Sequence, residues 1–192
     1  MLAPIQSRVG SVGAVTKYMT WLVPAAGPER DRLSTVIGGL ASEHDTPAFT
    51  PHITVTDSVE GDEISVLGVL QGVLSGRAGF EVKLNGFGHE PEYFRSLYLT
   101  VAECSALTEL HEAARQGWEQ IVPEYRPHLS LLYSDLPEES KDAIATGLGL
   151  ELPITVRFEA VELWADGGPR VPADASQDVA SWRRIARLLF PG

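Results

Sequence analysis

The spacing of hydrophobic and polar residues divides the chain into short strands that alternate with helices. Two-residue alternation with β-branched and aromatic residues is typical of strands. It predicts strands in residues 16–23, 52–55, 80–85, 94–101, 126–133 and 152–164. Apolar residues three and four positions apart are typical of amphipathic helices. They predict helices in residues 28–41, 62–75, 105–121 and 137–148.

The C-terminal part of this pattern holds two further details. The long strand predicted for residues 152–164 has a break in its alternation near Glu159 and Ala160, which indicates a β-bulge. Residues 182–190 fit a helix by their spacing, yet the segment is short enough for a strand. The order of the elements predicts an α+β protein of two related lobes, with antiparallel sheets facing one another around a central cleft and helices outside.

One seven-residue pattern occurs twice, as Phe49–Val55 (FTPHITV) and Tyr125–Leu131 (YRPHLSL). Each copy has an aromatic residue, a spacer and a proline, followed by His, an apolar residue, a hydroxyl residue and an apolar residue. The two histidines, His52 and His128, are 76 residues apart, which is the length of a half-module rather than of a solenoid repeat. The chain therefore carries one motif in each predicted lobe.

The alternation of side chains along a strand gives the two motifs a chemical meaning. His52 and Thr54 point to one face of their strand, and the aliphatic residues between and beyond them point to the other. His128 and Ser130 do the same in the second motif. Two such strands side by side predict a small polar site with two titratable imidazoles and two hydroxyls.

The paired His-apolar-Thr/Ser-apolar motif, each copy preceded by aromatic-x-Pro, resembles the two-histidine (2H) phosphoesterase superfamily. Within it, the chain looks most like the cyclic nucleotide phosphodiesterases of the plant and yeast type. Softer details support this resemblance, namely the Trp-Leu-Val-Pro run, the Phe-x-x-x-Tyr-Leu strand, the Leu-Trp pair and a late tryptophan, at Trp21–Pro24, Phe94–Leu99, Leu163–Trp164 and Trp182. The resemblance spans most of the chain after Val15, and it favours a strand for residues 182–190.

The resemblance implies metal-independent hydrolysis of a cyclic phosphate on a small nucleotide, with no cofactor. The substrates it suggests are nucleoside 2',3'-cyclic phosphates and ADP-ribose 1'',2''-cyclic phosphate, which arises in tRNA splicing. Carried over by position, His52 and His128 are the catalytic pair, and Thr54 and Ser130 bind the phosphate. Histidine can act as base or acid at neutral pH, and hydroxyls can donate to the phosphate oxygens. Our hypothesis is that His52 is the base and His128 the acid.

Other residues are weaker candidates for the same site. Arg95, near a predicted strand entrance, is a candidate phosphate ligand, since guanidinium groups bind phosphate bidentately; a solvated charge is the alternative. Tyr133 is a candidate substrate contact, although an unbroken strand would turn it to the face opposite Ser130. Tyr18, Trp21 and Tyr98 are candidates for base stacking, with core packing as the alternative.

The remaining histidines and any metal site are less favoured by the sequence. His44, His89 and His111 are expected to be solvated rather than ligating. A metal held by the two motif histidines would need a third ligand such as Asp57 or Glu124, and neither lies at a recognised metal-ligand spacing. We therefore expect no metal.

Composition limits the partners further. The net charge of −11 and the pI near 4.8 disfavour extended nucleic acid, whereas a small nucleotide held by a local cluster of donors is compatible with them. One cysteine, Cys104, and no apolar run long enough for a membrane span predict a soluble protein of a reducing compartment, in the cytoplasm or nucleus, acting as a monomer. Residues 1–15 read as a disordered leader, followed by one bilobal domain over residues 16–192.

Two other functions remain open on the sequence alone. One is a non-catalytic nucleotide- or RNA-binding module that kept the fold. The other is an RNA end-processing or 2'-5' ligase-like relative, which should carry a basic cleft that this composition does not indicate. The intact pair of histidines favours the hydrolase.

Overall fold

The computed structural model describes residues 16–121, 124–166 and 179–191. The predicted leader, residues 1–15, lies outside the described residues. The predicted strands and helices all form, with boundaries shifted by a few residues. The strands are β1 (Lys17–Pro24), β2 (Ile53–Glu60), β3 (Phe80–Gly88), β4 (Leu97–Val101), β5 (His128–Leu132), β6 (Ile154–Ala165) and β7 (Arg183–Leu189). The helices are α1 (Pro28–Glu43), α2 (Glu63–Leu74), α3 (Ser105–Gly117) and α4 (Glu138–Gly147).

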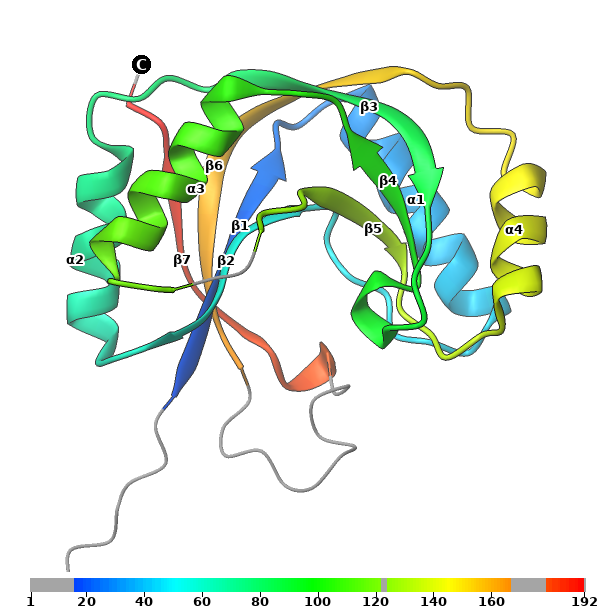
Figure 1. The fold of residues 1–192 in the computed structure, drawn as a ribbon, viewed down its shortest axis with the longest axis horizontal. Helices are drawn as coiled ribbons and strands as arrows, with labels where there is room; N and C mark the ends of the chain where they lie inside the picture. Colours follow the sequence, from blue (N-terminus) through cyan, green and yellow to red (C-terminus); the bar gives the residue numbers. More distant parts are fainter. Residues whose placement is uncertain (1–15, 122–123, 167–178, 192) are drawn as a thin grey trace, which may run out of the picture.

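The described strands form one antiparallel sheet in the order β1-β2-β5-β4-β3-β6-β7. Because β1 also pairs with β6, the sheet closes on itself, and β7 extends it from the other edge of β6. Figure 1 shows a strongly curved sheet whose two halves face one another, with the helices on the outside. The predicted α+β class with two related lobes is therefore confirmed.

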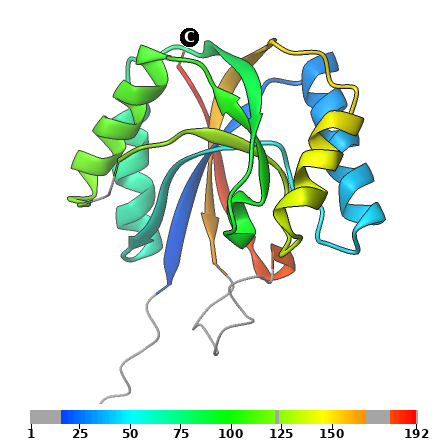
Figure 2. The same ribbon diagram turned by 45° about the vertical axis from the view of Figure 1, so that its right-hand side comes forward.

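The helices connect the two lobes. α3 precedes β5 in the chain but packs against β2 and against α2, whereas α1 precedes β2 but packs against β5. Figures 1 and 2 show α2 and α3 over one lobe, and α1 and α4 over the other. The helix that leads into one motif strand therefore covers the other motif strand, which links the packing of one lobe to that of the other.

The aliphatic residues of both motifs are buried beneath these helices, as the alternation predicts. Ile53, Val55, Leu129 and Leu131 are each no more than 2% exposed and belong to the main hydrophobic cluster. Ile53 pairs directly with Leu129, which joins β2 to β5. The hydrophobic effect therefore fixes which face each motif strand turns inward, because a slip of one residue would bury the polar side chains.

Several predicted boundaries need correction. Two strands are longer than predicted: the strand predicted for residues 52–55 continues to Glu60, and the one predicted for residues 80–85 continues to Gly88.

The strand predicted for residues 94–101 begins only at Leu97, because Tyr93–Arg95 forms a 3₁₀ turn. The helix predicted for residues 105–121 ends at Gly117. A Cβ at Gly117 would lie 2.8 Å from a methyl group of Val69 in α2, so the close approach of the two helices requires glycine there.

The predictions for the C-terminal strands hold. In the pairing of β1 with β6, Val23 lies opposite Ala160 and Pro24 opposite Phe158, which leaves Glu159 as the extra residue of the predicted bulge. Residues 183–189 form a strand, as the family resemblance indicates.

Aromatic residues of each motif stabilise the strand of the other. The Tyr125 hydroxyl donates to the Thr54 carbonyl oxygen at 3.0 Å, and the Tyr125 ring stacks on His111 at 3.8 Å. His111 is 4% exposed and hydrogen-bonds the Val55 carbonyl through Nδ1, so its predicted solvation is wrong. In the other direction, Phe49 of the first motif stacks at 3.9 Å on Tyr133, just beyond β5.

The Tyr125→Phe substitution tests this cross-connection. Burial raises the pKa of Tyr125, so its hydroxyl stays protonated and able to donate to Thr54. We expect its loss to lower the free energy of unfolding by about 1 kcal/mol, measured by urea denaturation. Tyr93→Phe is the matched control, since Tyr93 is half-exposed. Equal stability of the two variants would show that the bond to Thr54 contributes nothing.

Candidate active site

The polar residues of both motifs lie together on the face of the sheet turned away from the helices. This inner face carries Trp21, His52, Thr54, His128 and Ser130. Because Ile53 pairs with Leu129 in antiparallel register, the residues on either side of that pair turn to the inner face from both strands. The structure therefore brings the predicted histidines and hydroxyls into one place.

Both histidines are held by the same backbone contact. His52 Nδ1 lies 2.7 Å from the Thr50 carbonyl oxygen, and His128 Nδ1 lies 3.0 Å from the Arg126 carbonyl oxygen. A carbonyl oxygen can only accept, so Nδ1 must carry the proton in each ring. In the neutral form, Nε2 of each imidazole then carries a lone pair that can accept a proton. Both rings are therefore set to accept or deliver a proton through Nε2.

The two imidazoles nevertheless have different surroundings. His52 is 4% exposed, and its ring stacks on Trp21 with centroids 3.8 Å apart and planes inclined by 11°. Phe49 contacts it edge-on at 6.0 Å. Burial lowers the pKa of His52 to about 4; the hydrogen bond to Thr50 opposes this shift, and the nearby His128 adds to it. His52 is thus a neutral proton acceptor at neutral pH.

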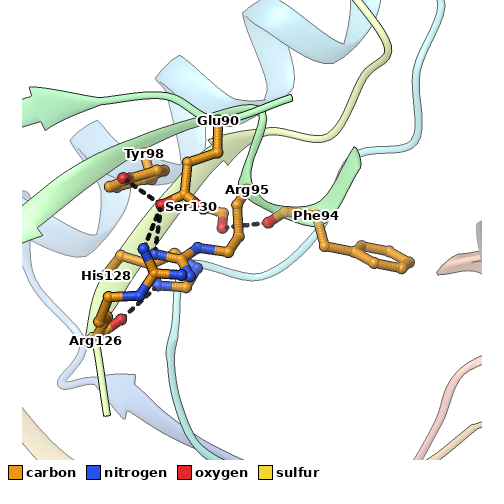
Figure 3. A network of polar contacts seen from close by, with 7 residues as sticks. All are labelled: Glu90, Phe94, Arg95, Tyr98, Arg126, His128 and Ser130. Atoms are coloured by element: carbon orange, nitrogen blue, oxygen red, sulfur yellow. Dashed lines mark hydrogen bonds and ion pairs between the residues drawn. The ribbon is translucent and has the colours of Figure 1, made fainter. Parts of the chain in front are cut away.

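Charged groups surround His128 instead. Its ring lies 4.9 Å from Tyr98, and Figure 3 shows Glu90, Arg95 and Arg126 gathered beside it. Burial is again the main cause that lowers the pKa of His128, and Arg95 and Arg126 act in the same direction. The Arg126 carbonyl and the Glu90 carboxylate oppose the shift, so they favour the protonated ring.

Glu90 positions the charged groups on this side of the site. One oxygen of its carboxylate, Oε1, lies 2.8 Å from Nη2 of Arg95 and 3.2 Å from Nη1 of Arg126, and accepts from the Tyr98 hydroxyl at 3.1 Å. Its backbone carbonyl accepts from the buried ammonium of Lys141 in α4 at 2.7 Å. No pattern in the sequence marks Glu90 or Arg126 as a site residue, although Arg126 is the spacer of the second motif.

The two motif hydroxyls also differ. Thr54 is half-buried on the inner face. Ser130 is 4% exposed, and its hydroxyl donates to the Phe94 carbonyl at 3.2 Å (Figure 3). A phosphate oxygen that accepted a hydrogen bond from the Ser130 hydroxyl would have to replace the Phe94 carbonyl as the acceptor.

The other candidate residues divide between site and core. Arg95 lies in the 3₁₀ turn beside His128, with its Nε buried and unpartnered among the described residues. Tyr133 follows the end of β5, is 3% exposed and stacks on Phe49, and burial raises its pKa. Tyr18 is 4% exposed and belongs to the main core, away from the inner face.

Some features are not seen in the described part of the chain. Among residues 16–121, 124–166 and 179–191, no three His, Cys, Asp or Glu side chains lie close enough together to hold a metal ion. No helix in those ranges is long and apolar enough to cross a membrane.

A protein family shares this pair of motifs. The family model described as the 2'-5' RNA ligase superfamily matches residues 43–170, a range that contains both histidine motifs. The chain belongs to this superfamily. The resemblance to the two-histidine phosphoesterases is therefore confirmed, and the protein is an enzyme of that kind.

Two relatives of this superfamily member have functional names. A "cyclic phosphodiesterase" of Arabidopsis thaliana is 26% identical over 125 residues, which cover 65% of this chain and 68% of the relative. A "2',3'-cyclic-nucleotide 3'-phosphodiesterase" of Phaeosphaeria nodorum is 29% identical over 194 aligned positions, covering 86% of this chain and 95% of the relative.

Solved structures show that the superfamily member shares its fold with bacterial proteins. Escherichia coli LigT, crystallised with 3'-AMP, superposes with a TM-score of 0.60 at 14% identity, over 93% of this chain and 99% of LigT. The protein TT0787 of Thermus thermophilus superposes with a TM-score of 0.58 at 13% identity, over 91% and 97% of the two chains. At these identities, the likeness establishes the fold alone.

Burial of His52 predicts that stability depends on pH. The pKa of His52 falls from 6.5 to about 4 on folding, so the unfolded chain takes up this proton first as the pH falls. The stability that His52 contributes is present above pH 6.5 and is lost as the pH falls toward about 4. Its share of the loss between about pH 7 and about pH 5 should be about 2 kcal/mol.

Urea denaturation of the wild type and of His52→Asn at the two pH values measures this share. Asparagine keeps an amide that can donate to the Thr50 carbonyl but does not titrate. We expect a smaller loss of stability in the variant. The same loss in both proteins would mean that His52 is not held neutral by the fold.

Proposed function

We propose that this superfamily member hydrolyses a cyclic phosphate on a small nucleotide to a phosphomonoester, with no metal. The observation that carries this proposal is the pair of histidines, both with Nε2 as the free nitrogen, on one inner face. A cyclic phosphodiester needs a base for water on one side of phosphorus and an acid for the leaving oxygen on the other. Two imidazoles, one neutral and one protonated, can supply this base and this acid. The functional names of the plant and fungal relatives agree with this chemistry.

His52 is the general base in this mechanism. Its Nε2 takes a proton from water as the water oxygen attacks phosphorus, and its low pKa keeps it deprotonated at neutral pH. The bond between phosphorus and one ring oxygen breaks. His128, in its protonated form, gives the Nε2 proton to that oxygen, so the leaving group departs as an alcohol rather than an alkoxide.

The different surroundings of the histidines support this assignment. His52 stacks on Trp21 in an apolar setting that disfavours the charged ring. Burial, with Arg95 and Arg126, lowers the pKa of His128 as well, but the Glu90 carboxylate opposes that shift and so favours the charged ring. The negative phosphate of the substrate would add to this effect and raise the pKa of His128 in the complex.

Three further residues bind the phosphate in this proposal. The hydroxyls of Thr54 and Ser130 donate to the non-bridging oxygens, Ser130 after leaving the Phe94 carbonyl. Arg95 is anchored through Nη2 to Glu90, and its buried Nε, which has no partner among the described residues, is left for an oxygen of the substrate. Tyr133, which stacks on Phe49 just beyond β5, is a further candidate for a substrate contact.

The protein as a whole favours a small substrate. Its net charge of −11 repels a long polyanion, so the nucleotide is bound locally by the donors of the inner face. One cysteine, Cys104, is half-buried and unpaired, as suits a reducing compartment such as the cytoplasm. We propose that the enzyme acts there as a monomer.

Incubation of His52→Asn and His128→Asn with nucleoside 2',3'-cyclic phosphates and ADP-ribose 1'',2''-cyclic phosphate, in the presence of a chelator, tests the proposal. Wild type should open at least one of them. Each variant should lose about 10²- to 10⁴-fold in kcat/KM, since each removes one proton-transfer group. His44→Asn, at the end of α1, is the control substitution. Full activity of either motif variant would contradict the mechanism.

The residual activity of the same variants assigns the two roles. Loss of the base should remove the rise of kcat/KM with pH on the acid side, and loss of the acid should remove the fall on the alkaline side. We expect His52→Asn to lose the rise and His128→Asn to lose the fall. The reverse pattern would exchange the two roles. Turnover only of an oligoribonucleotide ending in a 2',3'-cyclic phosphate would favour the RNA end-processing alternative.

A further inference from the structure

A row of directly paired residues leads from the first motif to the edge of the sheet. Thr54 in β2 pairs with Trp21 in β1, Trp21 pairs with Glu162 in β6, and Glu162 pairs with Arg187 in β7. Residues that pair directly lie on the same face of a sheet. Glu162 and Arg187 therefore lie on the inner face, in line with the proposed phosphate-binding hydroxyl of Thr54.

Glu162 is an unusual residue for that position. Its side chain is 1% exposed, and it accepts three charged or polar donors. Trp164 Nε1 donates to Oε2 at 3.0 Å, while Arg184 Nη1 and Arg187 Nη1 both donate to Oε1, at 3.0 and 3.2 Å. A buried carboxylate is costly unless fully hydrogen-bonded, and these donors satisfy it. The carboxylate holds two guanidinium groups in fixed positions.

The arginines carry more charge than Glu162 neutralises. Two guanidiniums share one carboxylate, and Arg187 has a second, longer contact of 3.9 Å with the exposed Glu159. The side chains of Arg184 and Arg187 remain 54% and 29% exposed. Each arginine has five N–H donors and gives Nη1 to Glu162, so donors remain for a ligand. This local cationic group stands out in a chain of net charge −11.

The surface between the arginines and the catalytic histidines is aromatic. Trp21 is 2% exposed and stacks on His52, and the half-buried Trp164 and Trp182 pack on Trp21 at centroid distances of 4.5 and 5.5 Å, so those two rings form the accessible part. Tryptophan faces pack well against sugars and bases. A ligand that runs from the histidines to the arginines would therefore cross an apolar surface with an anion site at its far end.

From these observations we infer that Arg184 and Arg187 form a subsite for a second phosphoryl group, on the 5'-oxygen of the ribose that carries the cyclic phosphate. This inference rests on the proposed function. The guanidiniums meet at Glu162, two strand spacings or about 10 Å from Thr54, a span that one ribose and its 5'-phosphoryl group can bridge. Planar guanidinium forks recognise phosphoryl oxygens bidentately.

The subsite distinguishes two classes of substrate. ADP-ribose 1'',2''-cyclic phosphate carries a pyrophosphate on the 5'-oxygen of the ribose that bears the cyclic phosphate, and a 5'-phosphorylated nucleoside 2',3'-cyclic phosphate carries a monophosphate there. A plain nucleoside 2',3'-cyclic phosphate has a hydroxyl at the same position. The enzyme should therefore prefer the first two substrates to the third.

Steady-state kinetics on adenosine 2',3'-cyclic phosphate, its 5'-phosphorylated form and ADP-ribose 1'',2''-cyclic phosphate test this inference. We expect kcat/KM for wild type to be at least about tenfold higher with a 5'-phosphoryl group. Arg184→Gln and Arg187→Gln should each reduce that ratio, largely through KM. A preference for the pyrophosphate over the monophosphate would identify which of the two sources the subsite fits.

Arg183→Gln is the matched control. It removes the same charge from the same strand, but Arg183 is 69% exposed and pairs with Glu63 of α2, at the side of the sheet that the helices cover. It should leave the ratio unchanged. Equal reductions in all three variants would mean a general charge effect and would overturn the subsite. Thermal melting of Arg187→Gln checks its fold. A wild-type ratio of about one overturns the subsite whether or not the variants fold.

Failure of this inference is distinct from failure of the proposed function. If wild type opens the plain and the 5'-phosphorylated nucleotides with equal kcat/KM, the subsite is wrong and the hydrolase remains. If wild type opens none of the three, the proposed function itself fails.

Discussion

The hydrogen bond from each histidine Nδ1 to the carbonyl two residues earlier is the interaction on which the site depends. In both motifs a proline separates that carbonyl from the histidine, at Pro51 and Pro127. Proline fixes its own φ and holds the preceding residue in an extended conformation, which presents the carbonyl in a repeatable way. The same backbone hydrogen bond therefore sets the orientation and the tautomer of the ring in both motifs. Without it, Nε2 of His52 and His128 would have no fixed direction.

The backbone is nearly symmetrical at the two motifs, but the side chains around them are not. His52 lies against Trp21 and loses solvent without gaining a charge partner, whereas His128 shares its surroundings with Glu90, Arg95 and Arg126. A duplicated strand thus supplies two equivalent imidazoles, and the neighbouring strands give them different electrostatic surroundings: an apolar one that keeps His52 neutral, and a charged one in which Glu90 opposes the loss of the His128 proton. The surroundings of the two histidines also differ farther away, because the paired residues that begin at Thr54 and Trp21 on the His52 side end at the arginines of β7.

The sequence predicts what depends on short-range periodicity. Alternation in the motif strands places His52 and Thr54 on one face and Ile53 and Val55 on the other, and burial agrees. Helix ends are less predictable: α3 ends at Gly117, four residues before its predicted end, and the close contact of Gly117 with Val69 of α2 is tertiary. His111 lies on an amphipathic helix with polar neighbours, and only the packing of α3 on β2 shows that it is buried.

Polar contacts between residues far apart in the chain cannot be predicted from the sequence for a similar reason. Glu90 lies in a Gly- and Pro-rich turn. Its role depends on contacts with Tyr98 in β4 and with Arg126, which lies just before β5 and far from Glu90 in the sequence. Glu162 looks like an ordinary polar residue of a half-buried strand until β7 brings two arginines to it. Tertiary pairing creates both sites, and no local pattern marks them.

The tautomer of the two histidines tests most directly whether Nε2 is the proton-transferring nitrogen of each ring. Long-range ¹⁵N–¹H correlation spectra of the imidazole rings, recorded at about pH 8 and assigned with His52→Asn and His128→Asn, report which nitrogen carries the proton. At that pH both rings should be neutral, because burial lowers both pKa values. We expect a proton on Nδ1 and a bare Nε2 in both rings. A proton on Nε2 of either ring would contradict the mechanism.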